Sequence, residues 1–244
     1  MIDSKKIIVV IPAYNNEQTL GGIFDRIPKN LAPLIDEFII VDDGSTDETR
    51  NKIGLLTQKY KNVTCIAHDV NKGYARAQKT GFRVAFNHGA DIAILLHADG
   101  QYAPEELEGL LEPLLKDECD MVQGGRILGG KALKGGMPLY KYLAIRFASV
   151  IENLVYGMKM LEYHSGYMLY SRRALRTIPF EKLSNTFYFD GEMLFVGHAK
   201  GLRIRSLPIS TRYARDIKSG VRPLKYVFDV GRIMAKKMLG GYKF

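Results

Sequence analysis

The stretch from Asp91 to Gln101 constrains the fold of this chain more than any other part of the sequence. Its apolar run, Ile92–Leu96, shows no alternation of polar and apolar residues, which is typical of a strand buried on both faces of a parallel sheet. The run ends abruptly in a short polar segment, His97–Gln101. Because open α/β sheets bind ligands at the carboxyl ends of their strands, we expect a binding site at this edge.

Two earlier apolar runs end in the same way. Ile7–Ile11 leads into a turn that begins at Pro12, and Phe38–Val41 leads into Asp42 and Asp43. Between the strands the sequence predicts helices over residues 19–27, 46–60 and 74–87, and a further strand over residues 63–67. This alternation predicts an α/β fold with a mostly parallel sheet and helices on both faces.

The charge is unevenly distributed along the 244 residues. Residues 1–125 hold 13 Lys and Arg against 19 Asp and Glu, whereas residues 126–244 hold 22 against 7. An acidic half could hold a cation, and a basic half suits phosphates or an anionic membrane surface. The alternative interpretation is ordinary solvated surface charge.

The two cysteines, Cys65 and Cys119, lie in apolar strand-like runs. We expect two buried thiols, a reducing compartment and no cysteine metal cluster. Residues 1–6 leave no room for a signal sequence before the first strand, and no run of ~18 uncharged apolar residues predicts a transmembrane helix. We therefore expect a cytoplasmic protein, peripheral at the inner face of the membrane.

The second half of the chain carries two amphipathic segments. Residues 138–161 mix apolar and aromatic side chains with a few charges, which predicts a helix lying in a membrane interface or, equally, a helix packed on the sheet. Residues 221–244 form a basic tail with a similar mixture. Short strands are expected over residues 119–123, 166–170 and 204–209, and a helix over residues 190–200.

The polar segment after the fourth strand offers possible metal ligands. His97, Asp99 and Gln101 alternate, so in an extended segment they project to one side. Carboxylate and amide oxygens suit Mg²⁺ or Mn²⁺ bound to a diphosphate, whereas imidazole shifts the preference toward Mn²⁺ or later metals. A purely structural histidine is the alternative.

The turns after the first two strands offer possible nucleotide contacts. Tyr14 presents an aromatic face for a base, while Glu17 and Asp42 can accept hydrogen bonds from ribose hydroxyls and base N–H groups. The alternative is that Asp42, Asp43 and the residues after them only form a turn and cap the next helix.

Five short motifs together resemble a known family. They are Ile11–Glu17, Val41–Asp47, Asn71–Gly73, Ala98–Gln101 and Ser165–Ser171. In this order and spacing the chain is similar to the family 2 inverting glycosyltransferases with a GT-A fold, a Rossmann-like sheet, and among them to the polyprenyl-phosphate (dolichyl-phosphate) sugar synthases. The similarity spans residues 7–213. It implies a GT-A domain over residues 1–215, with a donor half (1–125) and an acceptor half (126–215), followed by a basic amphipathic tail over residues 216–244.

The resemblance implies a UDP- or GDP-sugar donor and a divalent cation, Mn²⁺ or Mg²⁺. The residues it assigns to the donor are Pro12, Tyr14, Glu17, Asp42, Asp43, Lys72, Gly73, Ala98 and Arg212. It assigns the cation to Asp99 and Gln101. Most members of the family have Asp where this chain has His97, so the family pattern leaves the identity of the metal open.

The acceptor side offers two chemistries. A sugar hydroxyl needs a base to take its proton, and Asp190 would serve, although it could equally cap its own helix. A lipid phosphate is already ionised and needs only orientation and positive charge, for which Arg126 and the cluster of Arg212, Arg215 and Lys218 are suited. The basic second half favours transfer to a polyprenyl phosphate at a membrane; transfer to a glycan hydroxyl is the alternative.

Other classes of protein fit the sequence less well. A sugar-nucleotide pyrophosphorylase would need a glycine-rich phosphate loop after the first strand, and residues 12–17 do not form one. A non-catalytic protein whose site decayed at His97 is disfavoured by the acids at Asp42, Asp43 and Asp99. A nucleic-acid partner is suggested by charge alone, without a recognition motif.

Overall fold

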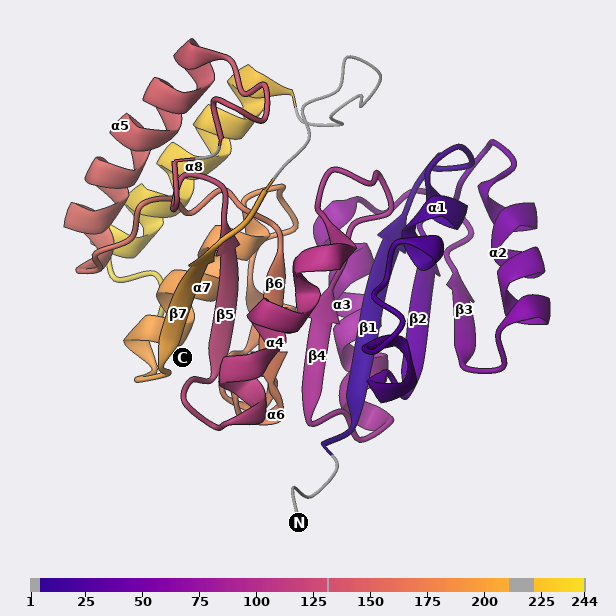
Figure 1. Cartoon of the computed structure of the whole chain (residues 1–244). Coiled ribbons are helices and arrows are strands. Elements are labelled where there is room, and N and C mark those ends of the chain that lie inside the picture. Colours follow the sequence, from indigo (N-terminus) through magenta and orange to yellow (C-terminus); the bar gives the residue numbers. More distant parts are fainter. Residues whose placement is uncertain (1–4, 131, 211–221, 244) are drawn as a thin grey trace.

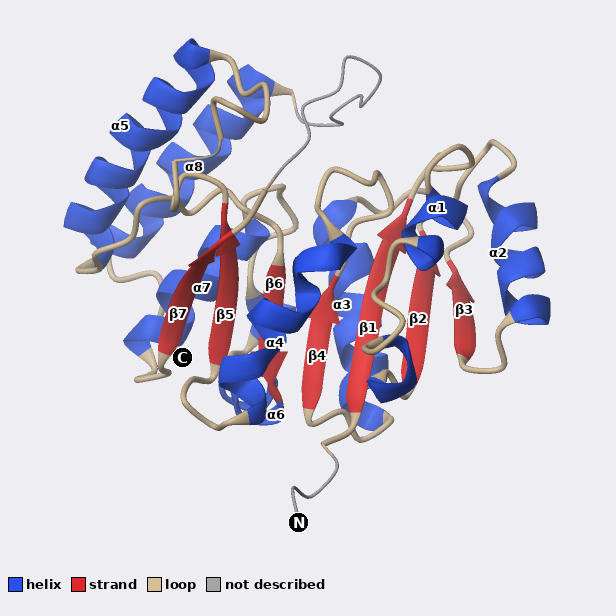
Figure 2. Ribbon diagram, in the orientation of Figure 1, coloured by secondary structure: helices blue, strands red, loops and turns tan. Residues whose placement is uncertain are grey.

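The computed structural model describes residues 5–130, 132–210 and 222–243. It contains a seven-stranded sheet with helices on both faces (Figures 1 and 2). The strands are β1 (Ile7–Ala13), β2 (Glu37–Asp42), β3 (Val63–Ala67), β4 (Ile92–Leu95), β5 (Met121–Gly125), β6 (Met168–Ser171) and β7 (Ile204–Pro208). Their order across the sheet is β3-β2-β1-β4-β6-β5-β7.

The α-helices are α1 (Leu20–Asp25), α2 (Thr49–Lys59), α3 (Tyr74–Asn87), α4 (Leu107–Leu115), α5 (Leu139–Tyr156), α6 (Arg172–Thr177), α7 (Phe189–Ala199) and α8 (Pro223–Met238). Short 3₁₀ helices span Ala32–Leu34, Pro104–Glu106 and Phe180–Lys182. β6 pairs antiparallel with both β4 and β5, and the other strand pairs are parallel. The predicted mostly parallel α/β sheet is confirmed.

The sheet separates two hydrophobic cores because successive strand side chains point to opposite faces. Ile8 and Val10 of β1 belong to the core that contains α3, α6 and α7. Val9 and Ile11 belong to the core that contains α1, α2 and α4. All four residues are fully buried, which explains why the strand reads as an uninterrupted apolar run.

The parallel register brings the ends of three strands to one edge. β1 lies between β2 and β4, with Ala13 opposite Asp42 and Val10 opposite Leu95. The segments that follow these strands therefore leave the sheet side by side, as expected from the sequence.

One expectation about the cysteines is wrong. Cys119 is buried, but Cys65 is exposed. Cys65 lies on β3, which forms one edge of the sheet, and alternate side chains of this edge strand point to solvent. Both thiols are free.

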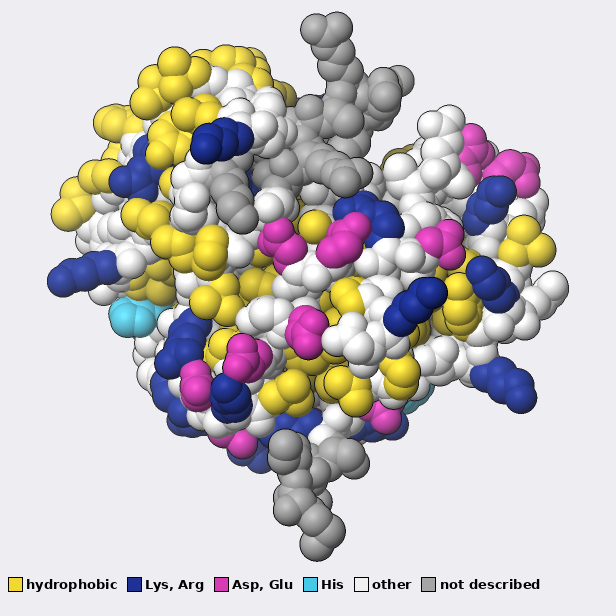
Figure 3. Space-filling view, viewed as in Figure 1, with side chains coloured by type: hydrophobic (Ala, Val, Ile, Leu, Met, Phe, Trp, Pro, Cys, Tyr) yellow, Lys and Arg dark blue, Asp and Glu magenta, His cyan; other side chains and the backbone are white. Residues whose placement is uncertain are grey.

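The amphipathic segment after β5 forms α5, which contacts α8 from the basic tail. Figure 1 shows the two helices side by side beyond the ends of β5 and β7. Large apolar side chains on their outer faces are exposed: Leu139, Tyr140, Leu143, Phe147, Val150, Leu154, Leu224, Val227 and Phe228. Figure 3 shows apolar side chains gathered over α5, with basic side chains among them. In the described part of the chain no helix combines the length and apolar character needed to cross a membrane.

Candidate active site at the carboxyl edge of the sheet

Asp43 holds together the loops that follow β2 and β3. Its carboxylate accepts hydrogen bonds from the backbone N–H groups of Lys72 (2.9 Å) and Gly73 (2.8 Å). It also lies 2.7 Å from Nδ1 of His68, and both side chains are buried. Three predicted donor residues, Asp43, Lys72 and Gly73, therefore lie in one cluster, in which Asp43 fixes the loop and Lys72 remains exposed.

A glycine allows these loops to approach each other. Gly44 has φ 70°, and a Cβ there would lie 2.5 Å from the backbone carbon of Val70. Any other residue would both strain the backbone and push the two loops apart. The Asp-Asp-Gly sequence after β2 thus has a steric reason as well as a chemical one.

Asp42 is buried beneath an exposed arginine. Its two carboxylate oxygens accept hydrogen bonds from the N–H of Ser45 (2.9 Å) and from Nε of Arg50 (2.8 Å). Burial raises the pKa of Asp42, but the hydrogen bonds from Ser45 and Arg50 outweigh it, so the pKa is lowered overall. Asp42 is therefore an anion whose outer oxygen is covered by a long, exposed side chain.

Tyr14 and Glu17 follow β1 at the same edge. The side chain of Tyr14 is 44 % exposed. Glu17 accepts a hydrogen bond from the N–H of Glu48 (2.9 Å) at the start of α2. Asp47 accepts a hydrogen bond from the N–H of Thr49 (3.0 Å), so Glu17 and Asp47 satisfy N–H groups at the start of α2, whereas Asp43 binds the loop at Lys72 and Gly73.

His97 faces a tyrosine and a backbone carbonyl. Its Nε2 lies 2.9 Å from the hydroxyl of Tyr74 and 3.1 Å from the carbonyl oxygen of Gly166. Because a carbonyl only accepts, Nε2 carries a hydrogen. A Cβ at Gly166 would lie 2.6 Å from this nitrogen, so only glycine permits the contact. In this arrangement Nε2 offers no lone pair to a metal.

Asp190 shares the same tyrosine. The hydroxyl of Tyr74 donates a 2.7 Å hydrogen bond to Oδ2 of Asp190, whereas Oδ1 is buried without a partner among the described residues. Burial raises the pKa of Asp190, and the electrostatic effect of His97 and the nearby side chains of Tyr74 and Gln78 offset part of the rise. Asp190 does not cap α7, which begins at Phe189. Its side chain points into the site instead.

The segment Ala98–Gln101 forms a turn rather than the extended run on which the alternation argument rested. β4 ends at Leu95, and Gly100 has φ 71°. Oδ1 of Asp99 accepts a hydrogen bond from the N–H of Gln101 (3.0 Å). The carbonyl oxygen of buried Ala98 accepts a hydrogen bond from the hydroxyl of Thr19 (2.6 Å). Asp99 and Gln101 are half-buried. The Nε2 of His97 is directed to Tyr74 and Gly166.

No group of three or more His, Cys, Asp or Glu side chains within the described residues is placed to hold a metal ion. A single carboxylate is nevertheless a suitable protein contribution for Mg²⁺ or Mn²⁺, since such ions are commonly held by one or two carboxylates and the phosphates of a substrate. Asp99 therefore fits a cation that enters with a diphosphate.

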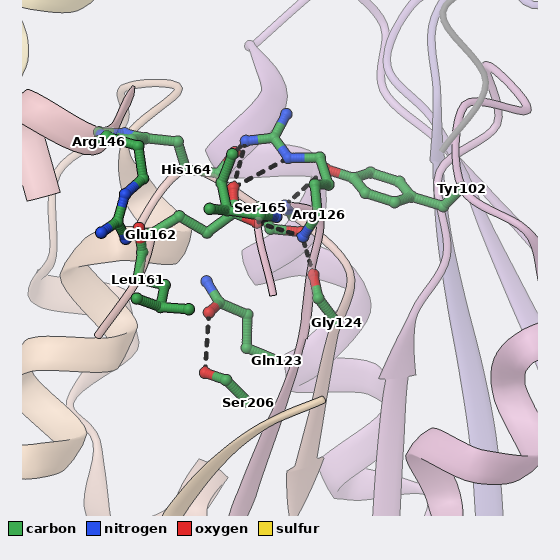
Figure 4. Close-up of polar contacts among 12 residues, drawn as sticks. Tyr102, Gln123, Gly124, Arg126, Arg146, Leu161, Glu162, His164, Ser165 and Ser206 are labelled. Atoms are coloured by element: carbon green, nitrogen blue, oxygen red, sulfur yellow. Dashed lines mark hydrogen bonds and ion pairs between the residues drawn. The ribbon is translucent and has the colours of Figure 1, made fainter. Parts of the chain in front are cut away.

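Arg126, at the end of β5, is buried in an ion pair. Its Nε and one terminal nitrogen lie 3.0 and 2.8 Å from Oε2 of Glu162, and that terminal nitrogen also donates to the carbonyl of His164 at 2.6 Å. The N–H groups of Arg126 and Ile127 donate to Oε1 of the same carboxylate. Figure 4 shows this pairing beside Ser165 and Gly124. The charge of Arg126 is thus already balanced.

A second cation lies near this pair. Burial, and then the positive charge of Arg126, lowers the pKa of Lys141 in α5. Lys141 is thus a second basic side chain within electrostatic reach of Arg126. The other predicted cations, Arg212 with Arg215 and Lys218, lie outside the described residues.

Sequence reasoning missed several residues of this site, among them Tyr74, Lys141 and Glu162. Glu162 has a recognisable signal, because it is an acid in an apolar, aromatic segment directly before the Ser165–Ser171 motif. An arginine placed just after a buried strand also requires a counter-charge. Tyr74 directly follows the Asn71–Gly73 motif, and its pairing with Asp190 spans 116 positions, which no local pattern reveals.

Comparison with known proteins identifies the family of the chain. Residues 8–178 match the sequence profile described as glycosyl transferase family 2. The chain is 32 % identical over 221 residues to the UDP-N-acetylglucosamine–dolichyl-phosphate N-acetylglucosaminyltransferase of Methanococcus voltae, covering 86 % of each chain. It is 27 % identical to the undecaprenyl-phosphate mannosyltransferase of Micrococcus luteus, covering 84 % of this chain and 83 % of the relative.

Solved structures agree on the fold. Glucosyl-3-phosphoglycerate synthase from Mycobacterium tuberculosis, in complex with Mn²⁺, UDP and phosphoglyceric acid, superposes with a TM-score of 0.69 at 20 % identity, covering 97 % of this chain and 78 % of that one. At this identity the likeness concerns the fold. The profile match and the relative from Methanococcus voltae go further, and they show that this chain belongs to glycosyl transferase family 2.

Proposed function

We propose that this chain transfers a sugar from a UDP- or GDP-sugar to a polyprenyl phosphate at a membrane surface, with inversion at the anomeric carbon. The similarity to transferases named for dolichyl phosphate and undecaprenyl phosphate supports this class of acceptor. The structural observation that carries it is the position of Lys141. This basic side chain, on which Arg126 acts electrostatically, belongs to α5, where the nearby Tyr140 and Leu143 expose apolar side chains. Such a place suits an anion that bears an apolar chain.

The donor would lie over the ends of β1, β2 and β4. Tyr14, Glu17 and Lys72 are predicted donor residues whose polar side chains are exposed or half-buried, and we assign them direct contact with the nucleotide. Asp42 would accept a base N–H in place of Arg50. Asp43, Gly73 and Ala98 hold the loops, and Pro12 sets the direction of the chain after β1.

A divalent cation, Mn²⁺ or Mg²⁺, bound by Asp99 and assisted by Gln101, would neutralise the leaving nucleoside diphosphate. The hydrogen bonds of His97 support a structural part for this residue, in which it orients Tyr74. The acceptor phosphate, ionised at neutral pH, would lie near Lys141 and Arg126 and attack the anomeric carbon without a base. A peripheral location at the inner face of the membrane is part of the same proposal, with α5 and α8 toward the lipid.

A second candidate function keeps the donor and replaces the acceptor by a glycan hydroxyl. The observation that favours it is Asp190, a buried carboxyl group with a raised pKa and an oxygen that lacks a partner among the described residues. These are properties of a general base.

The donor half of the proposal predicts a metal-dependent rise in melting temperature. UDP or GDP, but not both equally, is expected to stabilise the protein by mass action, and Mn²⁺ or Mg²⁺ to increase the effect. Differential scanning fluorimetry with each nucleotide, with and without metal, measures this. Asp99→Asn is expected to lose the metal-dependent part only, and Asp25→Asn, an exposed carboxylate on α1, to retain both parts. The absence of any shift would instead support a decayed site.

A further inference from the structure

A groove lies between α5 and the loop that follows it, and two of its lining residues, Arg146 and Leu161, lie beside the Arg126–Glu162 pair (Figure 4). Its volume is about 270 Å³. It is lined by Arg146, Ser149, Val150, Asn153, Met158, Lys159, Met160 and Leu161. We infer that this groove binds the phosphate of an anionic membrane phospholipid. The inference rests on the membrane contact in the proposed function, but it concerns a lipid that is not a substrate.

The groove is built by a fixed loop. Arg146, Ser149 and Asn153 follow helical spacing and so lie on one face of α5. Asn153 holds the opposite wall through both of its amide atoms: Nδ2 donates to the carbonyl of Met160 at 2.8 Å, and Oδ1 accepts the N–H of Met160 at 2.8 Å. The hydroxyl of Tyr163 donates to the same Oδ1 at 2.7 Å. The two walls are therefore held at a set separation.

The charge of the groove is positive. Arg146 and Lys159 line it, and no lining residue is acidic. Within residues 5–130, 132–210 and 222–243 neither cation forms an ion pair, and the guanidinium of Arg146 makes only a long contact, 3.4 Å, with the carbonyl of Leu161. The nearest acid along α5, Glu152, is buried and bonded to Tyr188. An anion in the groove would thus meet two cations that lack a described counter-charge.

A hydroxyl group in the groove also lacks a partner. Ser149 is 1 % exposed, and its Oγ has no hydrogen bond to any described residue. Buried polar groups are normally hydrogen-bonded. A phosphate oxygen could accept a hydrogen bond from this hydroxyl group, while the negative charge of the phosphate pairs with Arg146 and Lys159.

The surroundings select a lipid rather than a small anion. Val150 and Leu161 line the groove and are 55 % and 39 % exposed, and Leu154, one turn beyond Val150, is 82 % exposed. These side chains continue the exposed apolar face of α5. A phosphate seated between Arg146 and Lys159 therefore has an apolar surface beside it for the attached chains, which a phospholipid in the bilayer supplies.

The test is the choice between lipid headgroups at equal surface charge. Full-length protein is sedimented with phosphatidylcholine vesicles that contain either phosphatidate, whose headgroup is a bare phosphate, or phosphatidylserine at matched zeta potential. Wild type is expected to bind phosphatidate vesicles about fivefold more tightly, roughly the effect of one additional charge contact at a membrane surface. Ser149→Ala and the double variant Arg146→Gln/Lys159→Gln are expected to lose this preference.

The matched control removes two charges elsewhere. Arg232→Gln/Lys237→Gln on α8 is expected to weaken binding to both vesicles, by about fivefold per charge, and to keep the preference. Melting temperatures establish that each variant is folded. If the control variant loses the preference for phosphatidate equally, or if wild type shows no such preference, the inference that the groove binds a phospholipid phosphate is wrong.

Two further outcomes separate this inference from the proposed function. A wild type that binds no vesicle, or one that prefers polyprenyl-phosphate vesicles but not phosphatidate, overturns the groove as a phospholipid site. Transfer to a short, water-soluble polyprenyl phosphate tests the proposed function without any bilayer. If this transfer succeeds but wild type shows no headgroup preference, the proposed function stands and only the inference about the groove is wrong.

Discussion

Replacing Glu162 by glutamine is expected to lower the free energy of unfolding by about 3–5 kcal/mol, the usual cost of leaving one member of a buried ion pair without its partner. Arg126 and Glu162 are 4 % and 2 % exposed, so water cannot solvate the guanidinium when the carboxylate is removed. Glutamine also keeps only one acceptor oxygen, whereas Oε1 of Glu162 accepts the N–H groups of Arg126 and Ile127 and Oε2 accepts the guanidinium of Arg126. Urea unfolding at neutral pH measures the change.

The control is a surface pair of the same chemistry. Glu112 and Lys116 pair across one turn of α4, with side chains 60 % and 59 % exposed. Glu112→Gln is expected to unfold within error of wild type, because exposed pairs contribute little. If Glu162→Gln were as mild as this control, the charge of Arg126 would be balanced by another group and the account of the β5 end would be wrong.

Replacing Asp190 by asparagine is expected to raise the stability of the protein at pH 7, whatever its effect on activity. Burial raises the folded pKa of Asp190 above the ordinary 3.8. The stability that its neutral form contributes is complete below the unfolded pKa and is lost as the pH rises through the folded pKa. At pH 7, well above the ordinary pKa of a carboxyl group, burying Asp190 therefore costs stability, whereas an asparagine side chain does not ionise and still accepts the Tyr74 hydrogen bond. We expect a higher melting temperature for Asp190→Asn at pH 7 and little difference near pH 4.

The same variant distinguishes the two acceptor chemistries. A positioned general base contributes about 10²–10⁴-fold to the rate, so a hydroxyl acceptor predicts near-complete loss of transfer. A phosphate acceptor needs no base and predicts a loss of less than about tenfold. Initial rates at saturating donor measure the difference. A loss of the larger size with polyprenyl phosphate would make Asp190 essential in a way that our account does not explain.

The parallel half of the fold could be predicted because its signals are local. The bounds of β3 and α3 agree with the expected residues 63–67 and 74–87, since an apolar strand, a turn with Gly73 and a helix follow one another without ambiguity. The direction of β6 could not be predicted. Its pairing with β4 and β5 connects residues far apart in sequence, and a four-residue apolar strand fits either direction.

The position of the site in the fold was predictable, but most of the contacts between its side chains were not. Strand ends identified Asp42, Asp43 and Asp99 because parallel strands release their loops at one edge. The orientation of His97 was not predictable, because it depends on Tyr74 from α3 and on the missing Cβ of Gly166. The pairing of Glu162 required knowledge of a partner 36 positions away.

The most direct test of the proposed function is transfer from a radiolabelled UDP- or GDP-sugar to polyprenyl phosphate and, in parallel, to the corresponding polyprenol. Both acceptors present the same apolar chain, and they differ only in the phosphate that Lys141 and Arg126 are proposed to meet. The account predicts a labelled lipid product only when polyprenyl phosphate is the acceptor. Mild acid should release the label from this product as free sugar, as expected for a glycosyl phosphate. Equal transfer to the polyprenol, or transfer only to a glycan hydroxyl, would contradict it.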